Sequence, residues 1–276
     1  MKSEVMRICE KNGVTFLKYK IFDGIPFINH AVSTRHGGVS TEKELKSLNL
    51  GFKTDDKKEN VIENYKRFCN AADFDVNSLV FAKQTHSANV RIADENDCGK
   101  GIFKERDYTD VDAHITNIPG ISLVIHTADC VPVAFVDSKN KAIANAHCGW
   151  RGTFDTLALK TLQEMEKNFG TDPSDVICAI GPCICSDCYE VSKDLFLDFK
   201  NKFGFDTAIT EKEGNYYLDL ALINKLLLIN EGVKEENIAV SDLCTCCEKE
   251  DLYSHRGLGP KRGLISSVIC LSNRSK

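Results

Sequence analysis

The chain alternates many short strand-like runs with only a few helical segments, and this pattern restricts it to layered folds that contain both element types. Ten short runs of apolar or alternating residues predict strands. These runs cover residues 14–21, 25–33, 79–84, 88–93, 121–127, 132–137, 142–147, 175–180, 237–243 and 264–271. Helical periodicity predicts four helices, at residues 56–72, 153–169, 190–203 and 217–230. Because strands often follow one another directly, we expect a mixed α+β or α/β layered fold.

Nothing in the sequence divides the chain, and several classes of protein are disfavoured. The 276 residues contain no repeat and no linker rich in Pro, Gly or Ser, so we expect one domain over residues 1–276. The 35 Lys and Arg residues form no basic run and are outnumbered by 40 acidic residues, which argues against nucleic-acid binding. The most apolar segment, 123–136, is interrupted by polar residues and is too short for a membrane span. Residues 1–13 lack the apolar core of a signal peptide, so we expect a cytoplasmic protein.

Two pairs of neighbouring strands are predicted to form hairpins. Segments 79–84 and 88–93 are too close for a crossover, which would place His86 at a hairpin tip. Segments 132–137 and 142–147 flank a polar turn, and a turn centred near residues 139–140 pairs positions whose numbers sum to about 279. With that register, Cys130 and His147 meet at the open end of the second hairpin.

One cysteine and two histidines on these segments are candidate metal ligands. His86, Cys130 and His147 provide the three nitrogen or sulfur donors of a catalytic zinc site, whose fourth position stays open for water or substrate. Spacing alone also allows a buried thiol beside ordinary histidines. A Cys–His nucleophile pair, as in a hydrolase, is a further alternative because imidazole lowers a nearby thiol pKa.

The other cysteines fall into two groups. Thirteen cysteines in a reducing compartment are expected to stay free of structural disulfides. The first group contains Cys183, Cys185 and Cys188, and the second contains Cys244, Cys246 and Cys247. Two CxxC units could in principle bind zinc. The CxC and CC arrangements chelate zinc poorly, however, and structural zinc usually stabilises smaller domains, so we expect no second metal site.

Several residues are candidates for binding an anion. Arg35 lies just before Gly37 and Gly38, whose backbone N–H groups are candidates for binding phosphate. Arg151 lies near the start of the predicted helix at 153–169, and helix N-termini attract anions. Each segment is equally consistent with a tight turn beside a surface arginine.

Seven motifs, taken together and in order, resemble the purine nucleoside phosphorylase family once described as multicopper polyphenol oxidase or laccase-domain proteins. They are TRHGGVS at 34–40, KQTHSANV at 83–90, DAHIT at 112–116, LVIHTADCVPVAFVD at 123–137, AHCGWRGT at 146–153, IGPCICSDCYEV at 180–191 and LYSHRG at 252–257. The resemblance covers roughly residues 25–271. It implies a layered α/β/β/α sandwich with mixed sheets. It also implies phosphorolysis of adenosine, guanosine, inosine and S-methyl-5′-thioadenosine, together with adenosine deamination, so purine nucleosides and phosphate are the expected partners.

The same resemblance implies a zinc site made of His86, Cys130 and His147, the three residues that the hairpin argument singles out. It adds Arg35 and Gln84 as residues that face the site. Asp129, next to Cys130, is a candidate catalytic base or an acceptor that orients a ligand. The chain departs from the family pattern at Cys148, where alanine is usual, and at the continuation GLGPKRG after residue 256.

The older family name suggests copper-dependent phenol oxidation as an alternative activity. A multicopper centre needs about ten imidazoles and closely spaced histidine pairs, given the preference of copper for histidine. This chain has seven histidines and no HxH motif, although a single Cu²⁺ could occupy the zinc site. A binding module without catalysis is a further alternative. The sequence does not define the oligomeric state.

Overall fold

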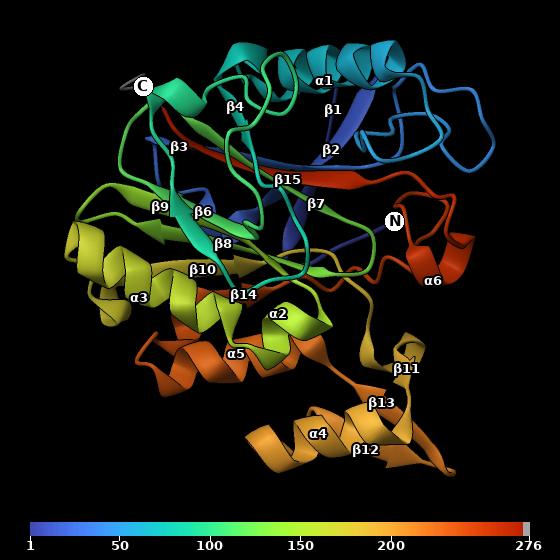
Figure 1. Cartoon of the computed structure of the whole chain (residues 1–276), viewed down its shortest axis with the longest axis vertical. Helices are drawn as coiled ribbons and strands as arrows, with labels where there is room; N and C mark the ends of the chain where they lie inside the picture. Colours follow the sequence, from blue (N-terminus) through green and yellow to red (C-terminus); the bar gives the residue numbers. More distant parts are fainter. Residues whose placement is uncertain (273–276) are drawn as a thin grey trace.

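The computed structural model describes residues 1–272, which form two stacked six-stranded sheets between layers of helices (Figure 1). The first sheet has the order β1 (Met6–Lys11), β2 (Val14–Tyr19), β3 (Ile28–Ser33), β15 (Ile265–Leu271), β7 (Ser122–Thr127) and β4 (Leu79–Phe81). The second has the order β14 (Ile238–Val240), β10 (Val176–Ile180), β8 (Val131–Asp137), β9 (Ala142–Cys148), β6 (Ala113–Thr116) and β5 (Val90–Ile92). Both sheets contain parallel and antiparallel pairs.

Helices cover the outer faces of both sheets, as Figure 1 shows. Helix α1 (Lys58–Ala72) lies on the first sheet, and α3 (Leu157–Phe169) with α5 (Leu220–Asn230) lies on the second. Helix α4 (Lys193–Phe203) packs on a small third sheet of β11 (Glu190–Val191), β13 (Asn215–Leu218) and β12 (Ile209–Lys212). The short helices α2 (Trp150–Phe154) and α6 (His255–Leu258) complete the order. The predicted mixed α/β fold with an α/β/β/α layering is confirmed.

Strand β8 shows why the chain forms two sheets with a core on either side. Its side chains alternate between faces, as the twofold period of a strand requires. Val133 and Phe135 pack toward the helical layer, whereas Ala134 and Val136 pack against the first sheet. A strand buried on both faces reads as a nearly continuous apolar run, which explains the composition of this segment.

Each of the ten predicted strand segments overlaps an observed strand, and one of the two predicted hairpins is confirmed. Strands β8 and β9 pair antiparallel with Val131 opposite Cys148 and Pro132 opposite His147, so the residue numbers sum to 279 as expected. The helix predicted at 153–169 is divided into α2 and α3, because Thr156 adopts a left-handed backbone conformation with φ of 58°.

The other predicted hairpin is wrong. Strand β4 pairs parallel with β7 in the first sheet, and β5 pairs parallel with β6 in the second. The segment between β4 and β5, which contains His86, therefore crosses from one sheet to the other instead of closing a turn. The segment is short enough to close a hairpin, but β4 pairs with β7 and β5 pairs with β6, so the two strands lie in different sheets. Strands β1, β6, β11, β12 and β13 were not predicted.

Within residues 1–272, no helix combines the length and apolarity that crossing a bilayer demands.

Two buried histidines and one half-buried histidine make the stability of the fold sensitive to acid. Burial is the main cause that lowers the pKa of His30, His114 and His126 to about 3, with nearby cations adding to it. The unfolded chain takes up protons on these side chains below pH 6.5, but the folded chain does so only near pH 3. The stabilisation that they contribute is therefore present above pH 6.5 and is lost as the pH falls toward 3.

We expect a His114→Leu substitution to reduce this loss of stability. His114 is fully buried, and neither ring nitrogen has a hydrogen-bond partner within residues 1–272. Leucine fills a similar volume and does not titrate. Between pH 7.5 and 5, the variant should lose about 2 kcal/mol less free energy of unfolding than the wild type. Urea unfolding at both pH values measures the difference, and equal losses in both proteins would contradict the prediction.

Candidate active site

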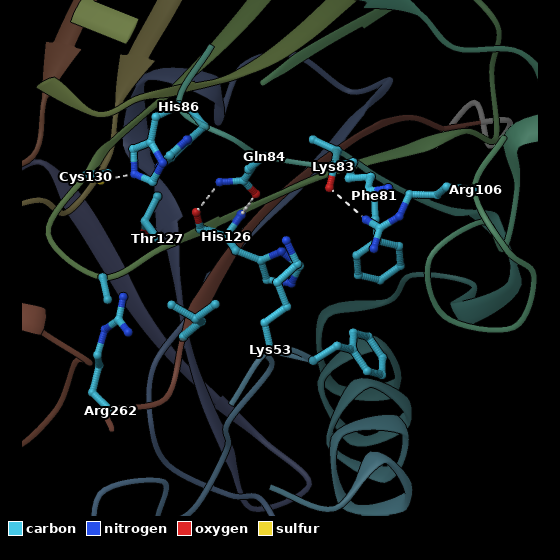
Figure 2. Close-up of a pocket in the computed structure, with 15 residues that line it drawn as sticks. Lys53, Phe81, Lys83, Gln84, His86, Arg106, His126, Thr127, Cys130 and Arg262 are labelled. Atoms are coloured by element: carbon cyan, nitrogen blue, oxygen red, sulfur yellow. Dashed lines mark hydrogen bonds between the residues drawn. The ribbon is translucent and has the colours of Figure 1, made fainter. Parts of the chain in front are cut away.

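The structure brings His86, Cys130 and His147 together from three segments. Cys130 directly precedes β8, His147 is near the end of β9, and His86 lies on the crossing between the sheets. One potential ligand atom from each residue lies within 4.8 Å of the others. The Sγ of Cys130 is 3.9 Å from Nε2 of His86, and the two imidazole rings lie 4.9 Å apart, edge to face (Figure 2 shows His86 beside Cys130). This donor set suits a borderline-soft metal such as zinc with one position open.

Asp112 holds two of these residues in place. Its carboxylate accepts hydrogen bonds from Nδ1 of His147 at 2.8 Å and from the backbone N–H groups of Thr85, His86 and Ser87. The Ser87 hydroxyl donates a further bond at 2.8 Å. With Nδ1 engaged by Asp112, Nε2 of His147 is the nitrogen available to a metal. The sequence analysis assigned no role to Asp112. Its position at the start of the DAHIT motif was the one feature of the sequence that pointed to it.

Electrostatics in this group favour a thiolate next to charged partners. Burial opposes ionisation of Cys130, but His147 and then His86 outweigh it and lower the thiol pKa to about 6. Burial also opposes charging of His147, yet Cys130 and Asp112 raise its pKa to about 9. Burial alone would raise the pKa of Asp112, but the bond from His147 and the backbone donors lower it to about 2. A thiolate is the form of cysteine that binds metals.

The backbone of Gly149 lies directly against the side chains of His86 and Cys130. A Cβ at this position would lie 2.9 Å from Cδ2 of His86 and 3.1 Å from Sγ of Cys130. Real Cβ atoms essentially never approach a neighbour to 2.9 Å, so a larger residue would displace His86 and press on Cys130. The glycine in the HCGWRG segment is thus explained by close packing.

A cavity of about 180 Å³ opens beside the three residues (Figure 2). Among residues 1–272, its lining includes four cationic side chains and no acidic one. The cations are Lys53, Lys83, Arg106 and Arg262. Apolar lining comes from Phe52, Phe81 and Leu264. The cavity therefore combines candidate metal ligands, apolar faces and positive charge, which suits a flat apolar ligand together with an anion.

Gln84, which the family resemblance adds to the site, also lines this cavity. Its side-chain amide donates to the carbonyl of His126 at 2.7 Å and accepts from the N–H of His126 at 2.8 Å (Figure 2). Both amide atoms are therefore used to join the crossing segment to β7. These two hydrogen bonds fix the orientation of Gln84 in the cavity wall.

Asp129 lies beside Cys130, but its carboxylate points toward other loops. It accepts hydrogen bonds from the Thr245 hydroxyl at 2.6 Å and from the backbone N–H of Arg256 at 2.7 Å. It does not line the cavity. Of the two predicted roles, this geometry matches an acceptor that orients the segment before Cys130, and it gives no support to a catalytic base.

Arg35, Gly37 and Gly38, the predicted phosphate-binding residues, lie away from this cavity. The Arg35 guanidinium donates to the carbonyls of Lys46 and Lys249. The N–H groups of both glycines donate to the Ser47 hydroxyl at 3.1 and 3.2 Å. These hydrogen bonds hold the three residues in a tight turn, and none of the three lines the cavity.

Arg151 does not line the cavity either. Its side chain is exposed and stacks over the Trp150 ring at 4.1 Å, at the start of the five-residue helix α2. The expected first helical residue near Thr153 is corrected to Trp150, with Gly149 as the N-cap.

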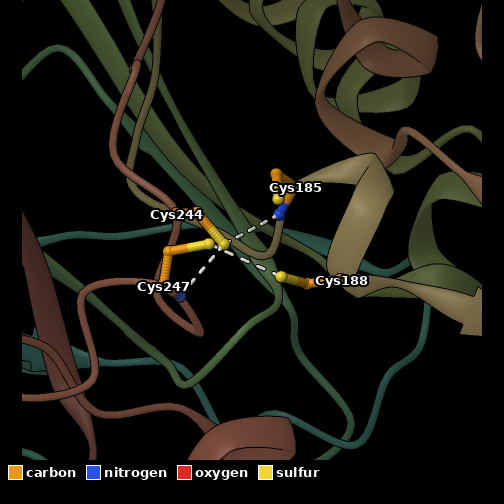
Figure 3. A group of neighbouring side chains, drawn as sticks. All are labelled: Cys185, Cys188, Cys244 and Cys247. Carbon is orange, nitrogen blue, oxygen red and sulfur yellow. Dashed lines mark hydrogen bonds between the residues drawn. The ribbon is translucent and has the colours of Figure 1, made fainter.

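A second group of potential metal ligands bears on the expectation that the chain has no second metal site. Cys185, Cys188, Cys244 and Cys247 have sulfur atoms within 4.8 Å of one another (Figure 3). We call these four residues the cysteine cluster. The expectation weighed two CxxC units against the CxC and CC neighbours, and the fold brings the two CxxC pairs together. Cys183 and Cys246 stay outside the cluster.

Residues 29–272 match the family described as multi-copper polyphenol oxidoreductase laccase. The chain belongs to this family. Curated relatives in this family include the purine nucleoside phosphorylase YlmD of Bacillus subtilis, 34% identical over 244 residues that cover 86% of each chain. A purine nucleoside phosphorylase of Bacteroides thetaiotaomicron is 35% identical and covers 92% of this chain and 96% of its own. The adenosine deaminase RL5 of an unknown prokaryotic organism is 32% identical and covers 84% and 90%.

Solved structures agree on the fold of this family member. The hypothetical protein YfiH of Bacillus licheniformis superposes with a TM-score of 0.90 at 31% identity, covering 98% of this chain and 100% of that one. YlmD of Geobacillus stearothermophilus superposes with a TM-score of 0.88 at 29% identity, covering 98% and 99%.

Proposed function

We propose that this protein is a zinc-dependent purine nucleoside phosphorylase that also deaminates adenosine. The observation that carries the proposal is the cavity in which His86, Cys130 and His147 share a wall with four cations and two phenylalanines. Phosphorolysis needs a purine nucleoside and an inorganic phosphate in one site, and this lining provides both kinds of contact. The relatives named purine nucleoside phosphorylase and adenosine deaminase support the same pair of reactions.

Different side chains of the cavity would contact the metal, the purine ring and the phosphate. Zinc bound by His86, Cys130 and His147 would supply a Lewis acid that activates water or polarises a substrate oxygen. Asp112 presents His147 in the tautomer that leaves Nε2 free to bind it. Phe52 and Phe81 offer apolar faces to a purine ring. The cations would neutralise phosphate as it approaches the ribose carbon.

Product analysis of adenosine with and without phosphate tests this function. Phosphorolysis converts adenosine and phosphate into adenine and ribose 1-phosphate, whereas deamination converts adenosine and water into inosine and ammonia. We expect adenine only when phosphate is present and inosine in both conditions. Neither product from the zinc-loaded protein, with phenol oxidation after copper loading, would contradict the proposal and favour the oxidase activity of the family name.

Arg262 is the strongest candidate for binding phosphate. Its guanidinium is partly buried at the cavity, and its Nε has no hydrogen-bond partner in the described chain up to residue 272. We expect Arg262→Ala to slow phosphorolysis by about 30- to 1,000-fold and deamination much less, because only the first reaction uses the anion. The measurement is the ratio of adenine to inosine formed from adenosine at saturating phosphate.

The neighbouring Lys261 provides a matched control. It is exposed and does not line the cavity, so Lys261→Ala should leave the product ratio unchanged. Equal decreases in both reactions of Arg262→Ala would assign this arginine to the nucleoside instead of the phosphate. A changed ratio in Arg35→Ala would restore the assignment of phosphate binding that the sequence predicts.

A further inference from the structure

Two CxxC pairs that are 59 residues apart converge at the surface to form the cysteine cluster. The first pair, Cys185 and Cys188, lies in the loop between β10 and β11, and the second, Cys244 and Cys247, follows β14. A parallel bridge between Cys183 and Cys244 aligns the two loops just before the sulfurs meet. Figure 3 shows the four side chains directed toward a common centre.

The sulfur positions match the dimensions of a four-thiolate metal site. A tetrahedral zinc with Zn–S bonds of 2.3 Å has its sulfurs about 3.8 Å apart. In the cluster, all four lie within 4.8 Å of one another, and those of Cys188 and Cys247 are 3.5 Å apart. A disulfide needs about 2.05 Å between its sulfurs, and one between Cys188 and Cys247 would leave the other two convergent sulfurs unexplained.

The backbone is arranged around these sulfurs as well. The N–H groups of Cys185 and Cys247 both donate to Sγ of Cys244, at 3.3 and 3.4 Å. The first loop closes into a 3-10 turn over Ser186–Cys188, in which the N–H of Cys188 donates to the carbonyl of Cys185. Donors directed at a sulfur stabilise its thiolate, and thiolates are the form that binds metals.

Burial separates this cluster from cysteines that serve only as small apolar side chains. Cys178 and Cys183 are buried in the core, as free cysteines usually are. Three members of the cluster are half-buried, and the fourth, Cys247, is exposed. Packing in the core therefore does not explain why four sulfurs gather there.

We propose that the cysteine cluster binds a second zinc ion with a structural role. Four thiolates fill the tetrahedral coordination of zinc and leave no position for a substrate. Soft thiolate ligands select zinc over hard cations such as magnesium and calcium. Binding releases the thiol protons to solvent, so that each cysteine binds as a thiolate.

This zinc fastens the loops that support the candidate active site. Within the joined loops, the N–H of Ile184 donates to the carbonyl of Asp129, and the Thr245 hydroxyl donates to its carboxylate. Arg256 reaches from α6 to the carbonyl of Cys188 at 3.0 Å and also donates its N–H to Asp129. Because Asp129 directly precedes Cys130, the cluster stabilises the segment that presents this ligand.

Zinc content measures the proposal directly. After dialysis against a mild chelator, we expect two zinc ions per wild-type chain and one per chain of the double variant Cys188→Ser, Cys247→Ser. The Cys130→Ala variant should retain one zinc. The zinc X-ray absorption spectrum of Cys130→Ala should show four sulfur ligands at about 2.3 Å. This measurement leaves the cysteine cluster intact, so it does not depend on whether a variant of the cluster folds.

Controls distinguish this site from the candidate active site. Cys246→Ser changes the cysteine that lies between two members but outside the cluster, and it should leave the zinc content at the wild-type value. If the active site bound no zinc, the wild type would hold one ion and Cys130→Ala would still hold it, which contradicts the proposed function alone. A Cys130→Ala protein without zinc, one with iron at the four sulfurs, or a chain with a Cys188–Cys247 disulfide after purification without reductant would overturn the cysteine-cluster proposal.

Discussion

Alanine at His86, Cys130 or His147 is expected to remove one zinc ion per chain and to slow both reactions by at least about 1,000-fold. The three residues share a single site, so removal of any one leaves two ligands, too few for tight binding. The lost Lewis acid accounts for several kcal/mol of transition-state stabilisation. Zinc analysis and assays with adenosine measure both effects. The fold should persist, because the apolar cores on both faces of the second sheet form without these side chains.

Cys148 provides the matched control for Cys130. It is a fully buried cysteine next to His147 in sequence, but it packs in the core below the helices. Cys148→Ala should keep the wild-type zinc content and activity despite a modest loss of stability. Retention of the active-site zinc in Cys130→Ala would exclude Cys130 as a ligand. Unfolding of all three variants would reassign the site as structural.

Asp112→Asn is expected to weaken zinc binding at the active site by about 10- to 100-fold. The carboxylate accepts from His147 on one oxygen and from the amides of Thr85 and Ser87 on the other. Asparagine replaces one of these acceptor oxygens with an NH₂ group, which cannot accept a hydrogen bond from the N–H groups on that side. Competition with a chromophoric chelator measures the affinity. Asp112→Ala removes the partner of the buried His147 ring and of several backbone N–H groups and should cost about 3–5 kcal/mol of free energy of unfolding.

Asp110 is the control for this effect. It lies two residues away, is exposed, and accepts a hydrogen bond from the Asn89 side chain at 2.7 Å. Asp110→Asn should change zinc affinity less than twofold, because surface polar contacts contribute little. Equal losses of affinity in Asp110→Asn and Asp112→Asn would show that the loop as a whole, and not the bond to His147, controls metal binding.

Local pairing explains which parts of the site could be predicted. Strands β8 and β9 are joined by a short turn, so their register follows from the turn and from the alternation of apolar residues. That register was sufficient to bring Cys130 close to His147. His86 was selected with them, but from a hairpin that does not exist. The resemblance to the family, not the spacing, supported that selection.

Sequence patterns did not identify site residues whose roles depend on contacts with distant segments. The role of Asp112 depends on β6 lying beside β9, and the cavity receives Lys53, Arg106 and Arg262 from segments that are far apart in the chain. An arginine close to two glycines in sequence occurs both in anion-binding loops and in closed turns, so the sequence made Arg35 an anion-ligand candidate. In the structure, its guanidinium donates hydrogen bonds to the carbonyls of Lys46 and Lys249 within a turn.

The sequence by itself determined the layered fold, the paired strands β8 and β9 and the identity of three candidate metal ligands. The fold, the strand pairing and the meeting of Cys130 with His147 rest on side-chain periodicity and on contacts between neighbours in the chain, which require little loop closure. His86 joined the candidate ligands through the resemblance to the family. Tertiary structure decided which strands share a sheet, which cations reach the cavity and which four of six cysteines meet. Each of these depends on contacts between distant segments, whose geometry is set by the packing of two sheets and their helices and leaves no periodic trace in the sequence.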